Sequence, residues 1–321
     1  MLQETLTLLF QLLIFPGAAF LILLAFISEW IDRKVVARIQ SRFGPLYTGP
    51  SGVLQPIADF LKLLSKEDIT PDGAEKPIFT ISPIIYFSLP LTALFLIPIL
   101  SETALVNFEG DLIFLIFIST LITITVFLAG YSSASSFSII GSIRSALQML
   151  GYEIPLSLAF IGPALAAGTL SLSGIVKWQI SHGIWTVFLQ PLGFGVILIC
   201  FLAELEFVPF DIPEAETEIV AGWRTEFSGR KLALLKLGRD LELLLASALT
   251  TSLYLGGAQP VSFVPPALTF LIKIFFVVFL FSLLRALFAR FRIDQMISGM
   301  WKHLIPLAIL QILLIILNVG R

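Results

Sequence analysis

Residues 204–231 read ELEFVPFDIPEAETEIVAGWRTEFSGRK, and they follow directly on the apolar run IWTVFLQPLGFGVILICFLA of residues 184–203. An apolar run of about 20 residues is what the core of a bilayer requires. The stretch after it, called the acidic loop below, holds six carboxylates within fifteen residues: Glu204, Glu206, Asp211, Glu214, Glu216 and Glu218. Charge near membrane depth is costly, so this cluster indicates a functional site.

The composition predicts the class of protein. Charged residues make up 13% of the 321 residues and apolar residues 57%, whereas a soluble domain carries about a quarter charged residues. We therefore expect an all-α integral membrane protein with a single membrane domain over residues 1–321. The net charge of -2 argues against a nucleic-acid partner. Cys200 has no second cysteine to pair with, and His182 and His303 are far apart, so the chain is expected to bind no cofactor or metal itself.

Eight apolar runs predict eight transmembrane helices. They cover residues 6–27, 84–100, 112–129, 147–169, 184–203, 241–257, 267–289 and 304–319. The first run lacks a small-residue cleavage signature, so it is expected to be a retained helix and not a signal peptide. Prolines within or beside several runs remove backbone hydrogen bonds, which predicts kinked and tilted spans.

Basic residues predict the orientation in the membrane. Seventeen of the twenty Lys and Arg residues fall in the first, third, fifth and seventh loops, and only Lys177 falls in the second, fourth and sixth. Because basic loops accumulate on the cytoplasmic side, we expect a multi-pass plasma-membrane protein with both termini outside. The long cytoplasmic loops are expected to dock a partner through Arg33, Lys34, Arg38, Arg42, Arg224, Arg230, Arg285, Arg290 and Arg292.

The first loop also contains an amphipathic pattern. Apolar residues recur at helical spacing at Leu54, Ile57, Ala58, Leu61 and Leu64, and the opposite face carries Gln55, Asp59, Lys62 and Lys66. The pattern is typical of a helix lying at the membrane surface. A lid over a cavity is the alternative, and the two roles are compatible.

Two interpretations of the acidic loop are open. Pro213 suits the first position of a new helix, whose N-terminus Asp211 and Glu214 would cap. On such a helix Asp211, Glu214 and Glu218 would share one face, and mutual repulsion would favour proton exchange. Capping requires only one or two acids, so we favour an ion relay, for which the sequence offers Glu153, Glu204, Asp211, Glu214, Glu216 and Glu218. Glutamine at Glu214 or Glu218 is expected to impair ion translocation but not assembly.

Four ordered motifs resemble one known family. They are DRKVVARIQSRFGPLYTGPSGVLQPIADFLKLLSKED (residues 32–68), RSALQMLGYEIP (144–155), PFDIPEAETEIVAGW (209–223) and LLRALFARFRIDQMISGMWKHLIPLA (283–308). Over nearly its whole length the chain is similar to the membrane component shared by respiratory complex I, where it is called the H subunit, and the energy-converting membrane-bound hydrogenases. The resemblance implies eight spans, a docking face for a hydrophilic electron-transfer arm, antiporter-like membrane partners and a carboxylate relay made of the six acids named for it above.

Three departures from that family bear on function. Phe207 and Tyr47 stand where quinone-reducing members have arginines, and Arg239 aligns with a family glutamate. We therefore expect a membrane-bound hydrogenase component that couples ferredoxin oxidation to H⁺ or Na⁺ translocation, with iron–sulfur clusters and a nickel–iron centre in partner subunits. One alternative is the quinone-site component of an NADH:quinone oxidoreductase. The other is a stand-alone secondary transporter, although the chain lacks the internal repeat common in transporters.

Overall fold

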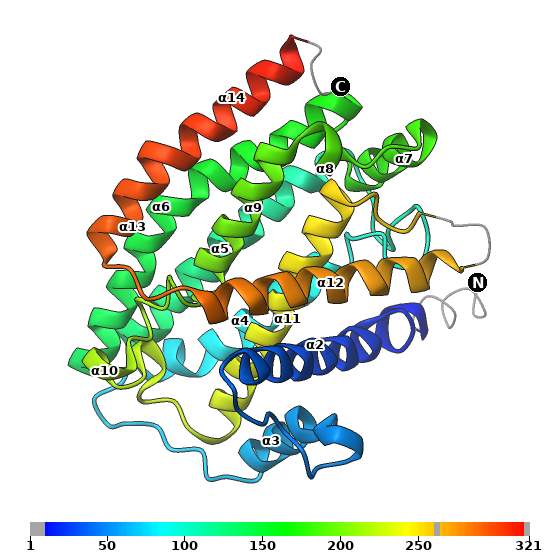
Figure 1. The fold of residues 1–321 in the computed structure, drawn as a ribbon. Coiled ribbons are helices and arrows are strands. Elements are labelled where there is room, and N and C mark those ends of the chain that lie inside the picture. The colour runs from blue at the N-terminus through cyan, green and yellow to red at the C-terminus, as the bar shows by residue number, and fades with distance from the viewer. Residues whose placement is uncertain (1–9, 260–263, 318–321) are drawn as a thin grey trace.

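The computed structural model describes residues 10–259 and 264–317, and helices dominate it (Figure 1). The main helices are α2 (Ala18–Ile39), α4 (Lys76–Leu94), α5 (Asp111–Ser132), α6 (Ser136–Ala167), α9 (Pro191–Glu204), α11 (Gly229–Tyr254), α12 (Pro266–Leu287) and α14 (Ile305–Ile316). Shorter elements are η1 (Pro50–Gly52), α3 (Gln55–Leu64), α7 (Leu172–His182), α8 (Thr186–Leu189), α10 (Glu216–Ile219), η2 (Gly222–Arg224), α13 (Ile293–Gly299) and the π-helical turn η3 (Met300–Leu304). The predicted all-α class is confirmed.

Six helical segments among the described residues are long and apolar enough to cross a membrane. They are Phe10–Ile39, Lys76–Leu94, Asp111–Ser132, Ser136–Ala167, Pro266–Leu287 and Ile293–Ile316. The prediction of eight such spans is therefore confirmed only in part. Predicted span 184–203 is divided between α8 and the 14-residue α9, which starts at Pro191. Predicted span 241–257 lies mostly on α11, whose N-terminal part carries six charged residues.

Helix α11 is the most enclosed long helix of the bundle. Its buried residues point in all directions around the helix, from Leu241 through Leu244 to Ala248. Gly238 lets it approach α4 closely, since a Cβ there would lie 2.5 Å from Cδ1 of Tyr86. Glu242, in this enclosed part of the helix, is buried by protein, which is where membrane proteins place ionisable groups.

The loops divide between the two ends of the bundle. The acidic loop contacts the first loop through Lys231 Nζ and Asp68 Oδ1 at 2.9 Å, the third through Ser145 Oγ and Glu206 Oε1 at 2.9 Å, and the seventh through Arg290 and Asp211. At the other end, Ala104 N donates to Ser173 Oγ. Figure 1 shows α3 and α10 at the bottom of the view and α7 and α8 at the upper right. The alternation expected from the basic residues is thus present for these six loops, while the sixth loop includes residues 260–263, outside the described part of the chain.

The amphipathic helix predicted in the first loop is α3. It packs against the bundle through Phe60, whose ring lies 5.8 Å from that of Phe26, and through buried Leu63. Leu54 and Leu61, placed on the apolar face by the sequence pattern, are 47% and 58% exposed. Asp59, placed on the polar face, points to Arg33 of α2. The prediction of a helix is confirmed, and the exposed Leu54 and Leu61 leave its placement at the membrane surface a prediction.

Candidate functional site

A cavity of about 790 Å³ lies where the acidic loop meets α2, α11 and α12. We call it the loop cavity. Its lining combines both signs of charge: Glu29, Asp32, Arg33, Glu206, Asp211, Glu214, Glu216, Arg224, Lys236, Arg239, Asp240, Arg285 and Arg290. Elements far apart in sequence supply these side chains, so the site exists only in the folded bundle.

Arginines pair with three of the predicted relay acids. Asp211 accepts two hydrogen bonds from Arg290, at 2.7 and 2.5 Å. Glu214 lies between Arg239, which donates at 2.8 and 3.0 Å, and Arg224. Glu218, whose side chain is 52% exposed, pairs with Arg144 at 2.6 Å. Glu216 is exposed at the cavity rim.

The prediction that a helix begins at Pro213 is wrong. Helix α10 begins at Glu216 and has four residues, so Asp211 and Glu214 belong to irregular backbone. The three acids do not share a helix face, and each faces a different arginine. Capping by Asp211 and Glu214 is also excluded, because neither precedes a helix that it bonds.

The charges of two loop arginines depend on their surroundings. The hydrogen bonds with Asp211 raise the pKa of Arg290. Burial, with a further contribution from nearby Arg239, lowers the pKa of Arg224 to about 10. Both arginines therefore remain cations at neutral pH and neutralise the loop acids.

Inside the bundle the acids have hydroxyl partners in place of arginines. Glu204 of α9 accepts a hydrogen bond of 2.5 Å from Ser119 of α5, and Glu153 of α6 accepts one from the adjacent Thr120. Glu242 of α11 accepts a hydrogen bond of 2.7 Å from Tyr86 of α4. The second carboxyl oxygens of Glu153 and Glu204 are buried without a hydrogen-bond partner among the described residues. A buried acid without a cation is costly to ionise, which suits a group that exchanges a proton.

Two small cavities lie between the interior acids and the loop cavity and share lining residues with it or with each other. Each has about 10 Å³, close to the space that one water molecule requires. One is lined by Tyr86, Glu206, Glu214, Arg239, Glu242 and Glu204, and the other by Ser119, Glu204 and Glu242. Polar side chains therefore continue from the loop cavity to Glu204, and from Glu204 across α5 to Glu153.

Glu242 and Tyr86 are absent from the sequence-predicted relay. Glu242 is the second residue of predicted span 241–257, where an acid near a helix end suggests only an interfacial side chain. The one signal in the sequence is the charge of Glu242 inside an apolar run. Its partner Tyr86 is 156 residues away, so the sequence gives no sign of the pairing. Lys273, by contrast, does not join the acids, because it donates to Gly257 O at 3.0 Å at the other end of α11.

Phe207 is flanked by cations. The guanidinium carbons of Arg285 and Arg239 lie 4.4 and 5.2 Å from its ring centroid. The loop cavity therefore carries positive charge beside Phe207, because α11 and α12 supply two guanidinium groups there. Tyr47 is 96% exposed and does not line the loop cavity.

The nine basic residues expected on the docking surface separate into two groups. Arg33, Arg224, Arg285 and Arg290 line the loop cavity and pair with acids of this chain. Arg38, Arg42, Arg230 and Arg292 are exposed, and Lys34 is half-buried. Docking through the exposed second group stays a prediction.

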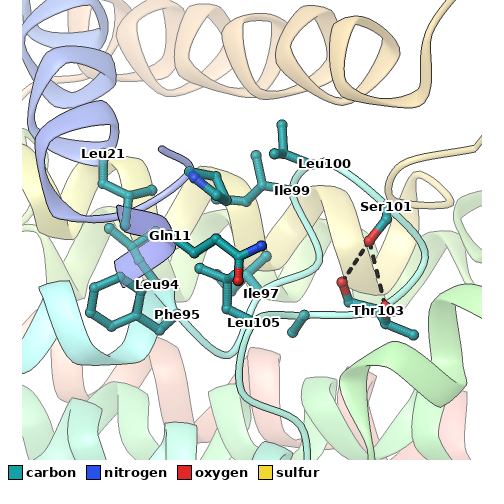
Figure 2. A pocket seen from close by; sticks show the side chains of 12 residues that line it. Gln11, Leu21, Leu94, Phe95, Ile97, Ile99, Leu100, Ser101, Thr103 and Leu105 are labelled. Carbon is teal, nitrogen blue, oxygen red and sulfur yellow. Dashed lines mark hydrogen bonds between the residues drawn. The ribbon is translucent and has the colours of Figure 1, made fainter. Parts of the chain in front are cut away.

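A second cavity, of about 300 Å³, lies at the other end of the bundle between the start of α2 and the chain after α4. Figure 2 shows its lining, which includes Gln11, Leu94, Phe95 and Leu105. The described lining residues are apolar or uncharged, and Ser101 Oγ donates to Thr103 O at 2.8 Å. This cavity therefore has no group for ion exchange, and the loop cavity is the candidate site.

The fold and site define a class, namely a helical membrane protein with an acid-rich cavity that continues into its interior. Residues 11–316 match the family model described as NADH dehydrogenase. The chain is 42% identical over 310 residues to the H subunit of NADH-quinone oxidoreductase from Bacillus cytotoxicus, covering 94% of this chain and 92% of that protein. The corresponding H subunits of Bacillus thuringiensis and Bacillus cereus are each 41% identical over the same shares. This chain belongs to the H-subunit family of complex I.

Proposed function

We propose that this chain is the membrane component that couples electron transfer to ion translocation in a complex I-type NADH:quinone oxidoreductase. The observation that carries the proposal is the polar path from the loop cavity to Glu153. Arginine-paired acids lie at its open end and hydroxyl-bonded acids inside the bundle. A change of charge in the cavity acts on Glu214 and Arg239 first and on Glu204 and Glu242 next, because low interior dielectric extends electrostatic effects.

The loop cavity suits a quinone headgroup in this proposal. Arg239 and Arg285 place positive charge beside Phe207, and an aromatic ring with two guanidiniums can orient a flat, carbonyl-bearing ligand. The relatives named above are components of quinone oxidoreductases, which agrees with this ligand class. Partner subunits supply the electrons, and this chain supplies the cavity and the acids.

Topology and location form part of the same proposal. We place the acidic loop and α3 on the cytoplasmic side because of the distribution of basic residues. The prediction that both termini lie outside concerns residues 1–9 and 318–321, which fall outside the described residues. In this arrangement α9 and α11 span the membrane together with the six longer segments. The short α9 fits where its neighbours bury it, since its residues Val196 and Ile197 are almost fully enclosed.

A second candidate is the hydrogenase branch of the same machinery, in which no quinone takes part. One observation favours it: Phe207 is only 5% exposed and already packs against both guanidiniums, which occupies faces that a ligand ring would use. In this candidate the same acids carry the ion, and the partner's nickel–iron centre accepts the electrons.

Turnover assays on the purified complex distinguish the quinone-dependent function from the hydrogenase candidate. Turnover is measured with NADH and with reduced ferredoxin, each with and without added quinone and a quinone-site inhibitor. The proposal predicts quinone-dependent turnover that the inhibitor abolishes and that Arg285→Met weakens. The matched control is Arg292→Met, whose side chain is 79% exposed. Turnover with ferredoxin that ignores both quinone and inhibitor would establish the second candidate.

A further inference from the structure

Glu206 has surroundings that differ from those of the arginine-paired acids of the loop cavity. Its Oε1 accepts a hydrogen bond of 2.9 Å from the hydroxyl of Ser145 on α6, and its Oε2 accepts one of 3.0 Å from the indole of Trp223 on η2. Both donors are neutral, and no ion pair among the described residues includes the Glu206 side chain. By its hydrogen-bond partners Glu206 therefore resembles the interior acids, although it lines the loop cavity.

The backbone also singles out this position. The φ angle of Glu206 is 52°, in the left-handed region. Its N–H donates to Ala203 O at 3.1 Å, and the next N–H, of Phe207, donates to Leu202 O at 3.0 Å, which closes the end of α9. Glycine is the usual residue at such a position, because a Cβ is disfavoured there. A glutamate in this conformation points to a role for its side chain.

Glu206 lines both the loop cavity and one of the two small cavities beside it. Glu214 and Arg239 also belong to both linings, but they form an ion pair with each other at 2.8 Å. Protonation of Glu214 would therefore disrupt its bonds to guanidinium groups. Of these three residues, Glu206 is the acid that can gain or lose a proton while its hydrogen-bond partners stay in place.

The two partners of Glu206 differ in what they permit. An indole N–H can only donate, so Trp223 fixes Oε2 as an acceptor in either protonation state. A hydroxyl both donates and accepts, so Ser145 can turn to accept a hydrogen bond from a protonated Oε1. Ser145 lines the small cavity. The oxygen that can carry the proton is thus the one on the side of that cavity.

The small cavity also has a receiving group. Its volume of about 10 Å³ is close to the space that one water molecule requires. Glu204, which is 8% exposed, lines it, and Oε2 of Glu204 is buried without a hydrogen-bond partner among the described residues. A water molecule in this cavity would have carboxyl groups of Glu206, Glu204 and Glu242 around it, which suits a buried water.

We propose that Glu206 is the entry acid of the ion path, exchanging protons between the loop cavity and the interior through one water molecule in the small cavity. Protonated Glu206 gives its Oε1 proton to the water, and the water gives one of its protons to Oε2 of ionised Glu204. Glu206 is left ionised, with Ser145 and Trp223 both donating to it, and the water is restored. No electron moves in this step. The inference rests on the ion path of the proposed function and adds a residue to it.

The ratio of protons translocated to electrons transferred, measured in the intact, membrane-reconstituted complex, tests this. Glu206→Gln keeps the size of the side chain and an acceptor for Trp223, but it has no acidic proton. The ratio should fall by at least about tenfold, the contribution expected of a positioned proton-transfer group. Glu206→Asp retains an acid and should restore part of the ratio. Glu218→Gln, which changes an exposed acid paired with Arg144, is the matched control and should keep the wild-type ratio.

An infrared difference spectrum between the oxidised and reduced complex separates proton exchange from a structural role. We expect a protonated-carboxyl band that is lost in Glu206→Gln and kept in Glu218→Gln. If Glu206→Gln fails to assemble, Ser145→Ala serves in its place, because it keeps the acid and removes the partner that can accept from Oε1. The proton-to-electron ratio should then fall several-fold.

The outcomes for Glu206 and for the ion path are distinguishable. A normal ratio in Glu206→Gln together with a loss in Glu204→Gln would overturn the role of Glu206 and leave the ion path intact. Normal ratios in both variants would contradict the ion path as well. An unchanged carboxyl band in Glu206→Gln, or a wild-type ratio in Ser145→Ala, would also overturn the proposal.

Discussion

The acids of the loop cavity and the acids of the bundle interior are the same residue types in opposite surroundings. Glu214 lies between two arginines, whereas Glu204 has one serine hydroxyl and a second oxygen without a partner among the described residues. A carboxylate fixed by guanidiniums holds its charge and its position. One held by a hydroxyl changes protonation more easily, since no cation stabilises its ionised form. From this comparison we propose a structural and sensing role for the arginine-paired acids of the loop, and ion exchange for those of the interior.

The largest expected effect is at Glu153. Glu153→Gln removes an exchangeable proton from the inner end of the path while keeping size and the bond to Thr120. Ion translocation should fall by at least about tenfold, given the usual contribution of a positioned proton-transfer group. Glu109→Gln, in an exposed loop at the other end, is the control. Ion uptake by vesicles containing the complex provides the measurement, and normal uptake by the Glu153 variant would remove it from the path.

Arg239→Met should have the next largest effect, on stability. The substitution leaves Glu214 with one cation and removes donors to the backbone oxygens of Leu205 and Glu206. Breaking a buried charge pair costs about 3 kcal/mol. The melting temperature of the complex should fall clearly, and Arg230→Met, exposed on the same helix, should leave it unchanged. Equal melting temperatures for the Arg239→Met and Arg230→Met variants would contradict the stabilising role given to Arg239.

Arg290→Ala should destabilise the complex less than Arg239→Met does. Arg290 donates two hydrogen bonds to Asp211, but the side chains of Arg290 and Asp211 are 29% and 21% exposed. A partly exposed pair of good geometry contributes about 1 kcal/mol. Thermal unfolding of the complex is again the measurement. A loss as large as that of Arg239→Met would mean that the link between the acidic loop and the chain before α13 matters more than its exposure indicates.

Arg292→Ala should have the smallest effect. The side chains of Arg292 and its partner Asp294 are 79% and 64% exposed, so the pair contributes less than about 0.5 kcal/mol. Assembly with the hydrophilic arm, measured by co-purification, is the sharper readout for this residue. Wild-type stability with reduced co-purification would support a docking role for Arg292. Wild-type stability with wild-type co-purification would show that Arg292 has no such role.

Much of this arrangement follows from the sequence. Apolar runs located the helices, basic residues predicted which loops share an end, and the density of acids located the site. Pairing could not be predicted, because the partners of Asp211, Glu214 and Glu218 lie 79, 25 and 74 residues away. The length of α10, which ends after four residues, could not be predicted either. Glu242 could not be singled out because it follows a charged stretch of α11, and only the fold shows that protein encloses residues 241–254 of this helix on all sides.

The most direct test of the comparison is the ratio of ions translocated to electrons transferred, measured in the same reconstituted complex for two variants. Glu204→Gln changes a buried acid with a hydroxyl partner, and Glu218→Gln changes an exposed acid with an arginine partner. We predict a ratio near zero for Glu204→Gln, with electron transfer retained. For Glu218→Gln we predict the wild-type ratio, in place of the impaired translocation expected from the sequence, because Arg144 pairs with this exposed acid. A normal ratio in Glu204→Gln, or the same loss in both variants, would contradict the assignment of ion exchange to the interior acids.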